Sequence, residues 1–140
     1  MFHHKYTEVY VLTYLPTGKK YVGKTTNMEY RFQQHVSSLR NGHHNSRELQ
    51  QDYDQYGGDK KAFLIETVGR RKGNSGRTGS DLEIATMIAL RTYDEIYGYN
   101  THDCAMQKIR KAENLFPIYL FGRCSRKAKL AKSEQKEMDE

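Results

Sequence analysis

The sequence predicts an α/β (α+β) fold in which helices flank a small, three-stranded, mainly antiparallel sheet. Residues 8–15 are rich in β-branched and aromatic side chains, and residues 16–18 supply a Pro/Gly turn before a second short strand at 19–24. Two strands joined by such a turn form a hairpin. The later pattern shows helical periodicity and one further strand: helices at 28–40, 45–56 and 80–93, a strand at 62–68 and a glycine-rich loop at 69–79.

Composition and charge narrow the classes of protein. The 140 residues have a net charge of +6, a pI of about 9.3 and a mean hydropathy of -0.91. No apolar run is long enough for a membrane helix and no signal-peptide pattern is present, so we expect a cytoplasmic protein without a membrane partner. The positive charge favours a polyanionic partner such as nucleic acid. Cys104 and Cys124 lack zinc-type spacing and are expected to be reduced thiols.

Two segments of different character divide the chain. Residues 1–103 contain the predicted sheet and helices and form the expected folded domain. Residues 104–140 indicate a basic helical extension, because positions 108–132 contain eight basic side chains and one acid, Glu113. Such a run is compatible with a DNA contact and equally with a charged helix face exposed to solvent.

The hairpin carries two triplets at a defined spacing. The first triplet is Glu8-Val9-Tyr10 and the second is Tyr21-Val22-Gly23, so their tyrosines are eleven residues apart. Arg31 and His35 follow on the predicted helix. These positions resemble the two name-giving triplets and the catalytic-helix signature of the GIY-YIG endonuclease family, and its small phage or homing-type members in particular. Glu8 departs from the first glycine of the usual triplet.

Three later residues extend the resemblance to about residues 8–100. His44 lies in a segment similar to the Gly-His-Asn stretch of homing-type members, and Glu83 stands where the family has its single metal-binding acid. Asn100 resembles the asparagine that closes the domain. The resemblance implies the GIY-YIG nuclease fold, an endonuclease dependent on Mg²⁺ or Mn²⁺ with Glu83 as the metal ligand, and six catalytic residues: Tyr10, Tyr21, Arg31, His35, His44 and Glu83.

The residue types suit phosphodiester hydrolysis without reference to any family. Such a reaction needs a nucleophilic water and relief of the charge that builds on the phosphate oxygens. Arg31 offers a planar fork for these oxygens and shares a helix face with His35. Glu83 offers one hard oxygen ligand for Mg²⁺, so a one-metal mechanism is expected. Glu83 also has a structural alternative, because Ser80 and Glu83 have the spacing of a capping box.

The identity of the general base stays open at this point. The resemblance favours Tyr10 with support from Tyr21. A phenol whose pKa is about 10 needs a lower pKa to act at neutral pH, and Arg31, Lys24 and the metal are sources of that shift. His35 offers another route for the proton. Each of these residues has an ordinary structural alternative as a packed strand or helix side chain.

Basic side chains near these residues predict contacts with DNA phosphates. The loop at 69–79 alternates glycines with cations and can become ordered on binding, although a solvated linker has the same composition. The expected DNA contacts are six residues: Lys24, Arg70, Arg71, Lys72, Arg77 and Asn100.

The sequence thus predicts a metal-dependent endonuclease that acts on double-stranded DNA, encoded by a phage or mobile element and compatible with a homo-oligomer on DNA. Two alternatives stay open: a restriction or repair nuclease of the same fold, and a non-catalytic DNA-binding protein that retains it. Plasmid nicking separates the enzyme from the binding protein, because a binding protein leaves supercoiled DNA intact.

Overall fold

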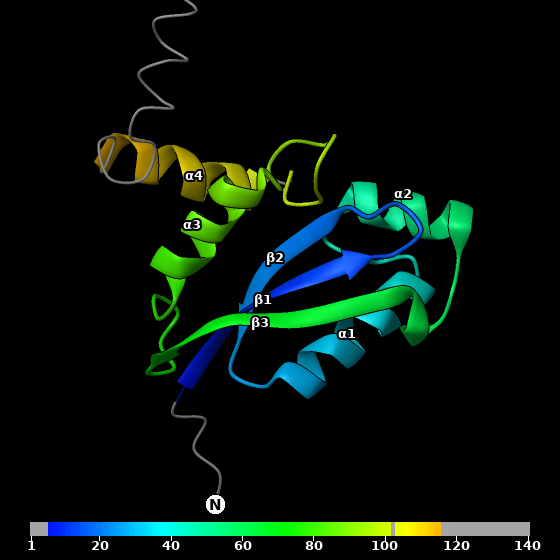
Figure 1. The fold of residues 1–140 in the computed structure, drawn as a ribbon, viewed down its shortest axis with the longest axis horizontal. Coiled ribbons are helices and arrows are strands. Elements are labelled where there is room, and N and C mark those ends of the chain that lie inside the picture. Colours follow the sequence, from blue (N-terminus) through cyan, green and yellow to red (C-terminus); the bar gives the residue numbers. More distant parts are fainter. Residues whose placement is uncertain (1–5, 102, 116–140) are drawn as a thin grey trace, which may run out of the picture.

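The computed structural model describes residues 6–101 and 103–115 (Figure 1). The elements in chain order are β1 (Tyr6–Tyr14), β2 (Lys20–Thr25), α1 (Met28–Arg40), α2 (Arg47–Tyr56), the short 3-10 helix η1 (Lys60–Ala62), β3 (Phe63–Lys72), α3 (Ser80–Leu90) and α4 (Asp103–Leu115). Within these ranges no helix is long and apolar enough to cross a membrane. The predicted basic extension beyond Leu115, with Cys124, lies outside the described residues.

The three strands form one antiparallel sheet in the order β2-β1-β3, which confirms the predicted fold class. β1 is the central strand and pairs with β2 from Glu8 to Thr13. It pairs with β3 along its whole length, with a register shift between Val9 and Tyr10. The hairpin therefore supplies the centre of the sheet, and β3 completes it from a distant part of the chain.

Each face of the sheet packs against its own pair of helices (Figure 1). The cluster that joins the sheet to α1 and α2 has nine buried members: Tyr10, Leu12, Tyr14, Tyr21, Val36, Leu39, Leu49, Phe63 and Tyr99. The cluster on the α3 and α4 side has six: Val9, Val11, Val22, Met87, Ala105 and Ile109. Successive strand residues point to opposite faces, so Tyr10 faces α1 while its neighbours Val9 and Val11 face α3.

Two elements differ in length from the prediction. β3 continues to Lys72, because residues 69–72 pair with the start of β1 instead of forming a free loop. α3 ends at Leu90, short of the predicted end at Tyr93, because Arg91 has a left-handed φ of 57° that terminates the helix. The first four residues of the predicted glycine-rich loop are therefore strand.

The residues before α2 and α3 determine where these helices begin. The side chain of Ser46 caps α2, so this helix begins at Arg47 rather than at residue 45. α3 begins after Gly79, whose φ of 80° favours glycine, and no side chain caps it. The alternative capping box between Ser80 and Glu83 is therefore absent, and the Glu83 carboxylate serves another purpose.

The two outer edges of the sheet differ. On β2, the Asn100 side chain accepts a hydrogen bond from the Val22 backbone N–H at 2.7 Å and donates to the Val22 carbonyl at 2.9 Å. Beside it, the backbone N–H of Tyr99 donates to the Lys20 carbonyl at 2.9 Å. These contacts close the β2 edge. The outer side of β3 pairs with no strand in the described part of the chain.

Candidate active site

The Tyr10 side chain crosses the neighbouring strand at Gly23. The register of β1 and β2 places these two residues opposite each other. A Cβ atom added to Gly23 would lie 2.6 Å from Cζ of Tyr10, closer than real Cβ contacts allow. The glycine of the second triplet therefore makes room for the phenol of the first, which is completely buried.

α1 presents two side chains to the Tyr10 hydroxyl. His35 Nε2 lies 2.6 Å from Tyr10 Oη, and Arg31 Nε donates to the same oxygen at 3.2 Å. One helical turn separates Arg31 from His35, so both project from the same face of α1. Arg31 Nη1 also donates to Gln34 Oε1 at 3.3 Å. Two nitrogens of one helix thus converge on a single phenol oxygen of the central strand.

His44 and Tyr21 complete the group around His35. The Nδ1 atom of His35 lies 2.8 Å from His44 Nε2, and the backbone N–H of Ser46 donates to His44 Nδ1 at 3.0 Å. The Tyr21 ring packs edge-on against both imidazoles, with centroid distances of 5.2 Å to His35 and 5.6 Å to His44. The neighbouring histidine, His43, is exposed. The structure therefore brings together the predicted catalytic residues of the hairpin, of α1 and of the following loop.

Burial controls ionisation in this group. Burial raises the pKa of Tyr10 well above its ordinary value, Tyr21 adds to the rise, and Arg31 opposes it. Burial, Arg31 and His44 together lower the pKa of His35 to about 2. His35 is consequently a neutral imidazole at physiological pH. Arg31 is the cation of the group, and it touches the phenol oxygen directly.

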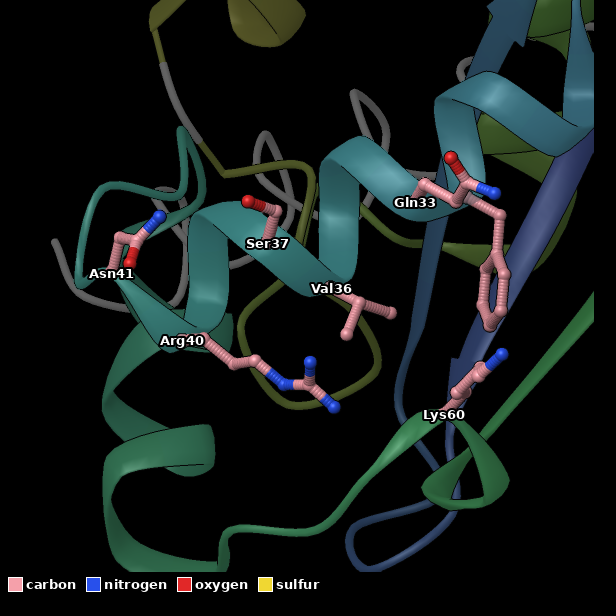
Figure 2. Close-up of a pocket in the computed structure, with 7 residues that line it drawn as sticks. Gln33, Val36, Ser37, Arg40, Asn41 and Lys60 are labelled. Atoms are coloured by element: carbon pink, nitrogen blue, oxygen red, sulfur yellow. The ribbon is translucent and has the colours of Figure 1, made fainter.

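Two surface cavities of about 340 Å³ each adjoin α1. One is lined by Tyr30, Arg31, Gln33, Gln34, Ser37 and Ser38, and it places Arg31 beside open space, as an arginine that binds phosphate requires. The other lies between α1 and η1 (Figure 2), and its lining contains none of the predicted site residues: Phe32, Gln33, Val36, Ser37, Arg40, Asn41 and Lys60.

Glu83 lies in the first turn of α3 and is 5% exposed. Its Oε1 atom lies 3.0 Å from Lys108 Nζ of α4, and its charge is near enough to Tyr10 to raise the pKa of that phenol. No group of three or more His, Cys, Asp or Glu side chains gathers within residues 6–101 and 103–115. A buried carboxylate that needs a counter-charge fits a hydrated Mg²⁺ or Mn²⁺ held by one protein ligand, rather than a protein cage.

This chain is similar to known proteins in sequence and in fold. The sequence model described as the GIY-YIG catalytic domain matches residues 6–74. Residues 6–74 carry a GIY-YIG domain. A catalytic domain of the homing endonuclease I-TevI is similar in fold, with 24% identity and a TM-score of 0.54 over 69% of this chain and 99% of that chain. A mutant catalytic domain of the intron endonuclease I-TevI gives 24% identity and a TM-score of 0.55 over 70% and 95%. No curated protein matches the chain.

Two residues of this GIY-YIG domain that were predicted to contact DNA, Lys24 and Asn100, make hydrogen bonds within the protein instead. The Lys24 ammonium donates to the Gly76 carbonyl at 2.5 Å, the Thr78 carbonyl at 3.0 Å and the Ser80 hydroxyl at 2.8 Å, which uses all three of its protons. The Asn100 amide is 2% exposed and serves the backbone of β2. Both placements disagree with a role in DNA contact, because the polar atoms already have partners inside the protein.

The other four predicted DNA contacts are exposed at one end of the sheet: Arg70, Arg71, Lys72 and Arg77. The guanidinium of Arg70 lies 4.5 Å from the centroid of the Tyr6 ring, and Arg71 Nε is 3.8 Å from an Asp81 carboxylate oxygen. In Figure 1 this is the end at which β1 begins and from which the chain continues into α3. Exposure leaves these cations available to a polyanion.

Two participants in the GIY-YIG site carry no signal in the sequence. Lys108 belongs to a run of basic residues, and nothing in its spacing connects it with Glu83. The backbone N–H of Ser46 binds His44, but a peptide group has the same chemistry at every residue other than proline. Only the folded geometry identifies either of them.

Proposed function

We propose that this chain is a divalent-metal-dependent endonuclease that hydrolyses phosphodiester bonds in double-stranded DNA, in the manner of homing-type members of a phage or mobile element. The observation that carries the proposal is the convergence of Arg31 and His35 on the hydroxyl of Tyr10. Hydrogen bonds from these two groups favour the phenolate form of Tyr10 and so oppose the rise of its pKa that burial causes, and the phenolate is the form that takes a proton from water. A protein that only binds DNA does not need this arrangement.

The reaction follows from these positions. A water oxygen attacks the phosphorus atom and forms a new P–O bond, while its proton passes to the phenolate oxygen of Tyr10. The bond between phosphorus and the leaving oxygen breaks, and that oxygen is protonated by solvent. Arg31 binds the phosphate oxygens, where it offsets the charge that builds in the transition state. His35 keeps its hydrogen bond to Tyr10 throughout.

Glu83 is the residue that would hold the divalent ion. When bound, the ion supplies Lewis-acid stabilisation of the phosphate and of the leaving oxygen. Glu83 contributes one hard carboxylate oxygen, consistent with Mg²⁺ or Mn²⁺ ligation in which water fills the other positions. In the free protein, Lys108 provides the counter-charge that this buried carboxylate requires.

The DNA backbone would pass the exposed basic end of the sheet. Arg70, Arg71 and Lys72 on β3 and Arg77 in the next loop would bind phosphates without reading base sequence. Within this proposal, residues 1–103 form the nuclease domain and residues 104–140 form a basic extension that adds to DNA affinity. A homo-oligomer on DNA would supply a second site for the second strand, and the protein would act in the cytoplasm of its host cell.

Plasmid cleavage tests the proposal. Supercoiled plasmid is incubated with Mg²⁺ or Mn²⁺ and the wild-type protein, Arg31→Ala or Glu83→Ala. We expect nicked or linear product from the wild type, and a rate lower by at least about 100-fold for each variant, because each removes charge stabilisation in the transition state. Arg47→Ala, an exposed arginine of α2, is the matched control and should cleave normally. If the wild-type protein leaves the plasmid intact with Mg²⁺ and also with Mn²⁺, the proposed endonuclease activity is refuted.

A further inference from the structure

Three side chains and one backbone amide form a continuous row through the site. The backbone N–H of Ser46 lies 3.0 Å from His44 Nδ1, His44 Nε2 lies 2.8 Å from His35 Nδ1, and His35 Nε2 lies 2.6 Å from Tyr10 Oη. The row thus begins at the N-cap of α2 and ends at the phenol of the central strand. The first link lies within the loop before α2, and the next two join this loop to α1 and α1 to β1.

The direction of the row follows from its first link. A backbone N–H can only donate, so His44 Nδ1 must accept and carries no proton. A neutral His44 then holds its proton on Nε2, which donates to His35 Nδ1. His35 must in turn be unprotonated at Nδ1 and hold its proton on Nε2, which donates to Tyr10 Oη.

The opposite direction meets a conflict at the first link. If Tyr10 donated to His35, then His35 would donate to His44, and His44 would carry its remaining proton on Nδ1. That proton would face the backbone N–H of Ser46 at a nitrogen–nitrogen separation of 3.0 Å. Two donors facing each other in a part-buried position are unfavourable, so one peptide group decides the tautomers of both imidazoles.

The direction assigns a role to every member of the row. Tyr10 Oη accepts from His35 Nε2 and from Arg31 Nε, so the hydroxyl proton of Tyr10 points away from both. His35 cannot take a proton from water or from Tyr10, because Nε2 already holds one and Nδ1 is occupied by His44. Burial and the neighbouring Arg31 also keep His35 neutral. Of Tyr10 and His35, only Tyr10, once it has lost its hydroxyl proton, can act as the base.

We infer that His44 is a positioning residue, which transmits the orientation of the Ser46 backbone amide to His35 and thereby makes Tyr10 the general base; the inference rests on the proposed nuclease function. Two neutral imidazoles in fixed tautomers hold a donor against the phenolate without adding a charge to the site. The predicted catalytic role of His44 is accordingly replaced by an indirect one.

The tautomers can be measured without DNA. Long-range ¹H–¹⁵N correlation spectra of the full-length protein distinguish the protonated from the unprotonated nitrogen of each imidazole, and His35→Gln and His44→Gln assign the signals. At neutral pH we expect both histidines to be neutral with the proton on Nε2. A proton on Nδ1 of either ring, or a charged His35, would overturn the inference.

Activity provides the second readout. His44→Phe keeps a ring but removes both nitrogens, so we expect kcat to fall by roughly 10-fold or more with KM for DNA unchanged, and the alkaline rise of rate with pH to shift upward. Four titratable groups face Tyr10 and shape this profile in both proteins: Tyr21 of β2, Arg31 and His35 of α1, and Glu83 of α3. In His44→Phe the His35 proton should also distribute between its two nitrogens.

Matched variants separate positioning from a general loss of structure. His44→Gln retains a donor at the position of Nε2 and should restore part of kcat, which a purely structural role of the ring would not allow. His43→Phe changes the adjacent exposed histidine and should leave kcat, the pH profile and the tautomers unchanged. If active wild-type protein and His44→Phe have the same kcat, the inference fails although the proposed function stands. If wild-type protein is inactive but the tautomers are as assigned, the proposed function fails instead.

Discussion

The two faces of the sheet hold their polar groups in different ways. On the α1 face, Tyr10, His35 and His44 are joined by short hydrogen bonds, and the first two are fully buried. On the α3 face, Glu83 is a buried carboxylate whose partner, Lys108, has 44% of its side chain exposed. The first arrangement is closed and the second has one side open to solvent.

The two faces suit different tasks, because the position of the Tyr10 oxygen must stay fixed whereas the cation beside Glu83 must be able to exchange. A row of buried groups that satisfy one another's hydrogen bonds has little freedom to rearrange, so it orients one oxygen reproducibly. A lysine on a flexible stem can leave a carboxylate for solvent and give way to another cation. The α1 face is therefore suited to position the proposed base, and the α3 face is suited to exchange an ion.

The largest expected effect comes from closing the gap through which Tyr10 passes. Gly23→Ala adds a Cβ atom where the phenol ring lies, so the ring must move away from Arg31 and His35. We expect cleavage to fall by at least about 100-fold and the free energy of unfolding to fall by ~1–3 kcal/mol. Plasmid cleavage and urea unfolding measure these two quantities.

Gly76→Ala is the control for this substitution. Nothing lies within 4 Å of a Cβ atom built on Gly76, and its backbone does not need a positive φ. The control should unfold and cleave as the wild type does. Wild-type cleavage by Gly23→Ala would show that the position of Tyr10 does not limit the reaction.

The next effect concerns stability and pH. The folded-state pKa of His35 is about 2, whereas an unfolded histidine has a pKa of about 6.5. Between these values the unfolded chain binds one proton more than the folded protein, so stability falls by ~1.4 kcal/mol for each pH unit below 6.5. At pH 4.5 we expect a loss of ~2–3 kcal/mol relative to pH 7.5.

Urea unfolding of the wild type and of His35→Gln at pH 7.5 and 4.5 isolates this contribution, because the other titrating groups are common to both proteins. The variant should be less stable at pH 7.5 but lose less stability on acidification. His43→Gln, which removes an exposed histidine, should follow the wild type. Equal losses in the wild type and His35→Gln would contradict a buried neutral imidazole.

A smaller effect is expected on the α3 face. Lys108→Met removes the cation that competes for Glu83, so the protein should bind Mn²⁺ roughly fivefold more tightly, as suits an exposed ion pair worth ~1 kcal/mol. Isothermal titration with Mn²⁺ in the absence of DNA gives the Kd. Lys111→Met changes an exposed lysine of the same helix and should bind as the wild type does. An unchanged Kd in Lys108→Met would mean that the lysine does not oppose ion binding.

The smallest effect lies outside both faces, at the basic end of the sheet. Arg77→Ala should weaken DNA binding only a few-fold and reduce the slope of log Kd against log salt concentration by about 1, because one phosphate contact is lost. Fluorescence anisotropy with a labelled duplex at several salt concentrations measures the slope. Lys24→Ala should leave the slope unchanged if its ammonium serves the loop, and an equal decrease for both variants would contradict that assignment.

Local patterns predicted the hairpin, the helices and the spacing that joins Tyr10, Tyr21, Arg31 and His35, because helical and strand periodicity depend on neighbouring residues. The length of β3 escaped prediction, since residues 69–72 become strand only by pairing with β1. Hydrogen bonds between side chains and distant parts of the chain could not be predicted for the same reason. The partners of Lys24 lie more than fifty positions away, and no single-sequence pattern reports such contacts.

The unequal edges of the sheet have a consequence for association. Asn100 and its neighbours close the β2 edge, so within the described part of the chain β3 is the strand that offers an outer side to an additional strand. Arg70, Arg71 and Lys72 are consecutive on that strand, and two such edges brought together would place like charges side by side. The cations proposed to attract DNA therefore also keep copies of the protein from pairing edge to edge, and salt weakens both effects together.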